Sequence, residues 1–155
     1  MRVPLRLVLA LIATLVTGDA AMSREGLITI RSSFDPGATM KRLEDEVRAK
    51  GLTIFAHVDH AAGASEVGMQ LRPTDLLIFG AAKGGTPLMQ ANQTIGIDLP
   101  LKALVWQDET GATFLSYNDP GYIARRHGLD EKVKAVVDAL SGVLRTIAAK
   151  VTSAQ

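Results

Sequence analysis

Cysteine is absent from this 155-residue sequence, and aromatic residues make up only 5% of it. Without cysteine there can be no disulfide and no lipoprotein anchor. The scarcity of aromatic residues argues against base-stacking platforms for nucleic acid. Charge of either sign is not in excess, with 17 basic and 16 acidic residues, so no long-range field attracts nucleic acid or acidic membranes. We therefore expect no nucleic-acid partner.

The first twenty residues have the pattern of a secretory signal. Arg2 and Arg6 precede an apolar run at residues 7–16, and small residues at 18–20 follow it. The run is short for a bilayer span. We predict a signal peptide over residues 1–20, cleaved near Ala20, and a periplasmic or secreted protein without stable membrane insertion after cleavage. An uncleaved membrane anchor is the alternative.

Hydrophobic periodicity divides the rest of the chain into strands and helices. Strands are predicted at residues 26–32, 52–60, 75–79, 102–107 and 113–118. Helices are predicted at residues 36–50, 61–67, 86–93, 120–127 and 131–150, the last capped by Asp130. This order predicts an α+β domain over residues 26–150, with a five-stranded mixed sheet and helices mainly on one face; a mixed α/β class is the alternative. Because one sheet face would stay open, we expect a homodimer.

A glycine-containing stretch, FGAAKGGTPLMQ at residues 79–90, follows a predicted strand. Gly80 and Gly85 have the separation of a nucleotide phosphate-binding loop, but Thr86 occupies the position that such a loop gives to lysine. A weaker anion site remains, since backbone N–H groups of a helix beginning at Thr86 attract negative charge and Lys83 would add to them. The simpler interpretation is that the glycines permit positive φ and Thr86 only caps the helix.

The histidines offer a second set of candidates. His57 and Asp59 share one face of a predicted strand, whereas His60 lies at its end, where binding residues gather. Asp59 equally fits the N-cap of the helix that follows, and His127 fits the last turn of its own short helix. A zinc site from His60, His127 and a carboxylate lacks any ligand-spacing motif, so we predict no metal and no cofactor.

Several segments together resemble one family. They are LTIFA and DHAA within residues 52–62, RPTDLLIFG at 72–80, GTPLMQ at 85–90, DLPLK at 98–102, YNDP at 117–120 and RH at 126–127. In these the chain resembles the bacterial and archaeal domain-of-unknown-function family 302, over roughly residues 26–144. The resemblance implies a small α+β fold, a dimer and no established activity. It includes His60, Asp119 and His127, whereas at Ala81 the family commonly has asparagine.

The candidate site residues are His60, Lys83, Thr86, Asp119 and His127, all at predicted ends of strands or helices. Such ends gather around one cleft in open α/β sheets. We hypothesise a cationic pocket in which Lys83 and the helix start at Thr86 face a small anion, with His60 as hydrogen-bond donor or base. This favours an exported ligand-binding or interaction module. The alternatives are a hydrolase with His60 as general base and a metal-handling protein, so enzymatic activity stays open.

Overall fold

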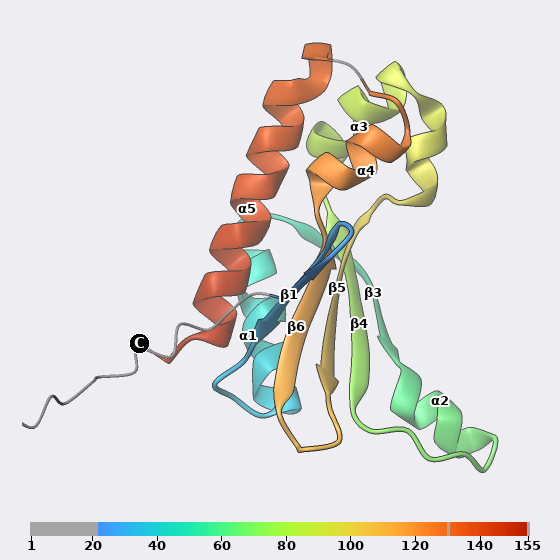
Figure 1. Cartoon of the computed structure of the whole chain (residues 1–155), viewed down its shortest axis with the longest axis vertical. Helices are drawn as coiled ribbons and strands as arrows, with labels where there is room; N and C mark the ends of the chain where they lie inside the picture. The colour runs from blue at the N-terminus through green and yellow to red at the C-terminus, as the bar shows by residue number, and fades with distance from the viewer. Residues whose placement is uncertain (1–21, 130, 155) are drawn as a thin grey trace, which may run out of the picture.

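The computed structural model describes residues 22–129 and 131–154. The predicted signal peptide and Asp130 lie outside the described residues. Within those residues, six strands form one sheet in the order β1-β2-β6-β5-β4-β3 (Figure 1). The strands are β1 Met22–Arg24, β2 Leu27–Arg31, β3 Thr53–Asp59, β4 Thr74–Gly80, β5 Leu101–Gln107 and β6 Thr113–Asn118.

Helices separate most of these strands along the chain. They are α1 Pro36–Ala49, α2 His60–Glu66, α3 Ala82–Ala91, α4 Pro120–Arg126 and α5 Lys134–Thr152, with short 3₁₀ turns η1 Gln93–Ile97 and η2 Glu131–Val133. Figure 1 shows α1 and α5 together on one side of the sheet, whereas α3 and α4 lie beyond the strand ends at the top. The remaining helix, α2, lies at the opposite end of the sheet.

The predicted α+β single-domain fold is confirmed, and all five expected strands are present. The expected mixed pairing is wrong, because every neighbouring pair of strands is antiparallel. A parallel pair requires a connection that returns the chain along the whole sheet. The seven residues of α2 span about 10 Å as a helix, whereas the seven residues of β4 span about 20 Å as a strand. The chain therefore leaves β3 and enters β4 at the same end of the sheet.

Local signals in the sequence explain where α1 begins and ends. Asp35 caps the helix by accepting a hydrogen bond from the backbone N–H of Ala38 at 2.8 Å, and Pro36 occupies the first turn. The chain leaves the helix through Gly51, whose φ of 70° favours glycine. Both features agree with the sequence prediction.

The main core lies between the sheet and the pair α1 and α5. Its fully buried members include Leu43, Val47, Leu77, Phe79, Val105 and Ile147. Each large side chain contributes roughly 1.5 to 3 kcal/mol before conformational entropy is subtracted. A second apolar cluster, beyond the strand ends, joins α3, η1, α4 and the start of α5. Its buried members are Leu88, Ile95, Ile123, Ala124, Val133 and Val137. This cluster fixes the helices that surround the candidate site.

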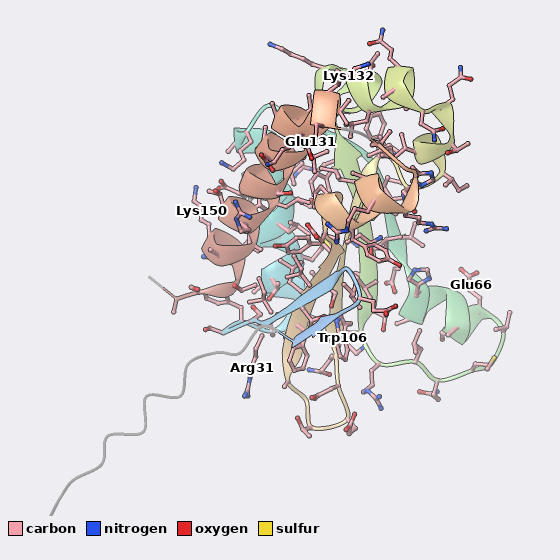
Figure 2. The ribbon with its side chains drawn as sticks, turned by 45° about the horizontal axis from the view of Figure 1, so that its top comes forward. Arg31, Glu66, Trp106, Glu131, Lys132 and Lys150 are labelled. Atoms are coloured by element: carbon pink, nitrogen blue, oxygen red, sulfur yellow. The ribbon has the colours of Figure 1, made fainter. Side chains whose placement is uncertain are left out.

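The layer formed by α1 and α5 leaves the other face of the sheet uncovered. On it, Trp106 stacks on Phe114 with ring centroids 4.8 Å apart, and its indole N–H donates to the hydroxyl of Ser116 at 2.9 Å. The cross-strand pair of Leu76 and Leu104 lies on the same face and is half-buried. We call this face of the sheet, which carries Trp106 and Leu104, the open face. Figure 2 labels Trp106 on the strands and Lys150 on α5.

Candidate functional site

The stretch that sequence analysis singled out begins helix α3 earlier than predicted. The helix starts at Ala82, and the carbonyl of Ala81 accepts hydrogen bonds from the N–H groups of Gly84 and Gly85 at 3.0 and 3.2 Å. Thr86 therefore lies inside the helix. The predicted role of Thr86 as the helix cap, with an anion at its N–H groups, is wrong, because the first turn is formed four residues earlier.

The glycine pair in this stretch provides room for helix packing. A Cβ on Gly84 would lie 3.3 Å from Cδ2 of Leu140 on α5, and one on Gly85 would lie 3.5 Å from Cδ1 of Leu99. Neither glycine has a positive φ. Gly84 thus lets α3 approach α5, which is a different reason for glycine from the positive φ that the sequence suggested. A side chain at Gly85 would make only an ordinary contact with Leu99.

A cavity of about 650 Å³ lies between the start of α3, helix α5 and the adjoining ends of β4 and β5. Its walls are apolar or small and include Leu52, Phe55, Leu99, Val136, Leu140 and Val143. Lys83 is the single charged residue of its lining, and Lys83 itself is exposed. Among the described residues no carboxylate forms an ion pair with it. The cavity volume falls within the range of small-molecule sites.

His127 lies near this end of the sheet but is held in a hydrogen-bond network of its own. Its Nε2 lies 2.6 Å from Oδ2 of Asp98, and its Nδ1 lies 2.8 Å from the hydroxyl of Thr94. Because an ionised carboxylate only accepts, Nε2 donates to Asp98. The Asn92 side chain donates to the carbonyl of His127 at 2.7 Å. These bonds fasten the end of α4 to η1, and His127 does not line the cavity.

Asp98 and Asn92, which hold His127, were not predicted from the sequence. Asn92 accepts from the N–H of Thr94 at 3.0 Å and so begins η1. An asparagine two residues before a threonine has this capacity to form an Asx turn. That signal was present in the sequence, but it identifies a turn and not the histidine that packs against it.

Asp119 is committed to capping α4. Its carboxylate accepts from the N–H groups of Gly121 and Tyr122 at 3.1 and 3.2 Å, and its own N–H donates to the carbonyl of Gly26 at 2.7 Å. The sequence prediction that a helix begins here is confirmed. Asp119 does not line the cavity either.

His60 lies far from the other four candidates. It is the first residue of α2, beside Asp59, and Asp59 pairs with Asp75 near the start of β4. Lys83 follows the other end of β4, about 20 Å away at strand spacing. The hypothesis that His60 and Lys83 open onto one cleft is therefore wrong. The two residues mark opposite ends of the sheet. We call the end at Asp59 and Thr74 the α2 end, and the end at Gly80 and Leu101 the α3 end.

The physical reason for this separation is strand direction. Ligand sites gather at the carboxyl ends of strands when the strands are parallel. In an antiparallel pair the carboxyl ends of the two strands lie at opposite ends of the sheet. His60 after β3 and Lys83 after β4 are therefore at opposite ends.

His57 contacts two carboxylates on the helix-covered face. Its Nε2 lies 2.9 Å from Oδ1 of Asp75 and its Nδ1 lies 3.2 Å from Oε1 of Glu44 on α1. The imidazole separates the two carboxylates, so the three groups do not converge on a point. Within residues 22–129 and 131–154, no three histidine, aspartate or glutamate side chains are arranged to hold a metal ion.

Comparison with known proteins shows which family the chain belongs to. The sequence pattern of the family described as "Domain of unknown function DUF302" matches residues 28–147. The chain belongs to this family. A DUF302 crystal structure from Bacillus stearothermophilus, titled an uncharacterized conserved protein, superimposes with a TM-score of 0.73 at 19% identity, over 82% of this chain and 98% of that one. This likeness confirms the fold, and the predicted resemblance is confirmed with it.

Two curated relatives are more similar in sequence than that structure. Proteins named "Fluoride-specific ion channel FluC 1" from Brucella suis biovar 1 and "Fluoride-specific ion channel FluC 2" from Brucella melitensis biotype 1 are each 41% identical over 130 residues, which is 81% of this chain. The chain spans about half the length of these relatives, 51% and 48% respectively. In the part of the chain that the structure describes, none of the helices has the length and apolar character of a membrane span.

Proposed function

We propose that this DUF302 domain is a small-ligand-binding module and that its ligand occupies the cavity at the α3 end. The observation that carries the proposal is the cavity itself, about 650 Å³ with one cation, Lys83, in an otherwise uncharged lining. Pockets of this size and apolar character are the usual sites of small molecules. The expected anion preference is kept, but His60 is not part of the proposed site.

Binding is favoured over hydrolysis by the chemistry of the lining. A general base must lie within hydrogen-bond reach of the proton that it removes. The cavity is lined by aliphatic, phenyl, proline, methionine and glycine groups besides Lys83. His60, the residue expected to act as general base in the hydrolase alternative, is not among them.

A cavity-filling substitution tests the proposal. Ala139 lines the cavity and is exposed on α5, so Ala139→Trp would fill the cavity without entering the buried core. Ala149→Trp is the matched control, exposed on the same helix near its other end. We expect anilinonaphthalene sulfonate, a dye with an aromatic body and one anionic group, to bind the parent chain and the control, and Ala139→Trp to weaken its binding at least tenfold. Equal binding by both variants would contradict a site in this cavity.

We further propose that the protein is exported and functions in the periplasm or outside the cell. The basic start and apolar run of residues 1–20 support this, together with the absence of cysteine. Mass spectrometry of the protein from a periplasmic fraction should find an N-terminus near Ala21. An intact N-terminus in a membrane fraction would favour the uncleaved anchor instead.

The homodimer also stays a proposal, and the open face supports it. Apolar side chains are also exposed on the segment after α2, where Val67, Met69 and Leu71 are 71%, 65% and 49% accessible. Exposed apolar surface marks association sites when it forms a patch. Sedimentation analysis should give a dimer, and Met69→Asp should shift it toward monomer. A monomer at high micromolar concentration would contradict the dimer.

A second candidate function comes from the Brucella relatives, whose names include a fluoride-specific ion channel. We propose, as the alternative, that this chain binds fluoride at Lys83. The 41% identity to those proteins is the observation in its favour. Titration of fluoride observed by ¹⁹F NMR should then show a broadened, shifted resonance that Lys83→Met abolishes. An unchanged resonance at millimolar protein would contradict it.

A further inference from the structure

We infer that the ligand of the α3-end cavity is a single-chain amphiphile with one anionic head, of the fatty-acid class. This inference rests on the proposed function and adds the chemistry of the ligand. Three properties of the cavity lead to it: the character of its walls, the position of Lys83 and the accessibility of that lysine.

The walls select for a hydrocarbon body. Leu52, Phe55, Val136, Leu140 and Val143 present aliphatic and phenyl surface, and no hydroxyl, amide or carboxylate side chain joins them. A buried polar group without a hydrogen-bond partner costs free energy on the order of 1 to 3 kcal/mol. Sugars, nucleotides and peptides would each place several such groups against these walls. A methylene chain places none.

Lys83 selects for one negative charge on the head. It is the only charged residue lining the cavity, it is exposed, and no described carboxylate neutralises it. A ligand with its chain among Leu140 and Val143 can therefore keep its head in water beside the ammonium group. The dianionic head of a phosphate monoester would leave one charge without a protein partner, since the lining offers a single cation. A carboxylate fits the charge present.

The experiment compares heads on a constant chain and then varies the chain. Isothermal titration calorimetry of the purified chain would use dodecanoate, dodecanol and dodecyltrimethylammonium, each below its micelle concentration. We expect dodecanoate to bind at least threefold more tightly than dodecanol, consistent with a partly exposed ion pair. The trimethylammonium compound should bind most weakly. Affinity should rise about fourfold for each methylene from octanoate to dodecanoate, in line with the transfer free energy of a buried methylene.

Charge reversal at one residue separates the head from the chain. Lys83→Glu should lose the preference for dodecanoate and gain one for dodecyltrimethylammonium, while its affinity for dodecanol stays within twofold of the parent. Lys41→Glu, on the exposed surface of α1, is the matched control and should change none of the three affinities.

The outcomes distinguish this inference from the proposed function. If dodecanol and dodecanoate bind equally and Lys83→Glu changes neither, the cavity binds ligands but the anionic-head inference is wrong. If none of the three binds, while anilinonaphthalene sulfonate binds the parent and Ala139→Trp weakens that binding, the fatty-acid inference is wrong and the proposed function stands. If the dye also binds Ala139→Trp as tightly as the parent, the proposed function is wrong as well. A preference for the carboxylate that Lys83→Glu reverses and Ala139→Trp removes supports both.

Discussion

The two ends of the sheet differ in what their side chains do. At the α3 end, α3, η1, α4 and α5 form an apolar cluster of their own, and polar residues such as His127 and Asp119 hold these helices in place. At the α2 end, α2 buries no residue, and apolar side chains after it are exposed. Figure 2 labels Glu66 on α2 at the right of the view and Lys132 at the top. The cavity in which we propose a ligand lies at the α3 end, and the exposed apolar residues at which we propose a second copy follow α2.

This difference explains why the polar residues at strand ends were poor guides to the site. Asp119 and His127 are near the cavity because they fix the helices around it. The cavity is lined mainly by aliphatic residues, none of which was a candidate in the sequence analysis. Lys83 is a candidate from the sequence that also lines the cavity.

The largest contrast in stability should come from paired truncations at the two ends. Leu88→Ala removes a side chain that is 2% exposed in the α3-end cluster and should lower the free energy of unfolding by about 2 to 5 kcal/mol. Met69→Ala, 65% exposed beyond α2, should change it by less than about 0.5 kcal/mol in the monomer. Urea denaturation measures both. Equal losses would remove the distinction between the ends.

Substitutions of His127 and His60 should differ less in their effect on stability. His127→Ala removes one hydrogen bond each from Asp98 and Thr94, which keep their contacts with Arg126 and Asn92, and should cost about 1 to 3 kcal/mol. His60→Ala removes an exposed ring at the α2 end and should cost less than about 0.5 kcal/mol. Thermal unfolding of both variants checks this. A destabilised His60→Ala would show that its imidazole has a structural role that the contacts do not show.

The smallest effect should lie in the helix layer that both ends share. A hydrogen bond from Lys150 on α5 is the largest cause that lowers the pKa of Glu46 on α1 below its ordinary value of 4.5; charge on Lys150 and Lys50 adds to it, and burial opposes it. Because the pKa is lower in the folded state, the ionised carboxylate stabilises the fold above about pH 4.5, and this stabilisation is lost as the pH falls through the folded pKa.

Glu46→Gln should therefore destabilise the protein at pH 7 by about 1 kcal/mol, a modest amount because Lys150 is half exposed. The difference should shrink as the pH falls below about 4.5. Denaturation midpoints at pH 3, 5 and 7 measure it, with Asp45→Asn on the exposed surface of α1 as control. A difference that is as large at pH 3 as at pH 7 would assign the effect to packing instead of charge.

The strands and the starts of α1 and α4, at Pro36 and Pro120, could be predicted from the sequence, because each depends on a few neighbouring residues. Sequence reasoning failed where distant segments decide. Gly84 is small because Leu140, far along the chain, lies against it, and His127 is fixed by Asp98. The direction of each strand, which separates His60 from Lys83, depends on how the connections cross the sheet, and no local pattern records it.

The most direct test of the account is to locate the ligand by NMR. Dodecanoate titrated into ¹⁵N-labelled protein should shift the backbone amides of Gly84, Gly85 and Ala139 around the cavity. The amides of α2, from His60 to Glu66, should not move. Shifts confined to α2, or saturable binding that leaves Gly84 and Gly85 unchanged, would contradict a ligand site at the α3 end.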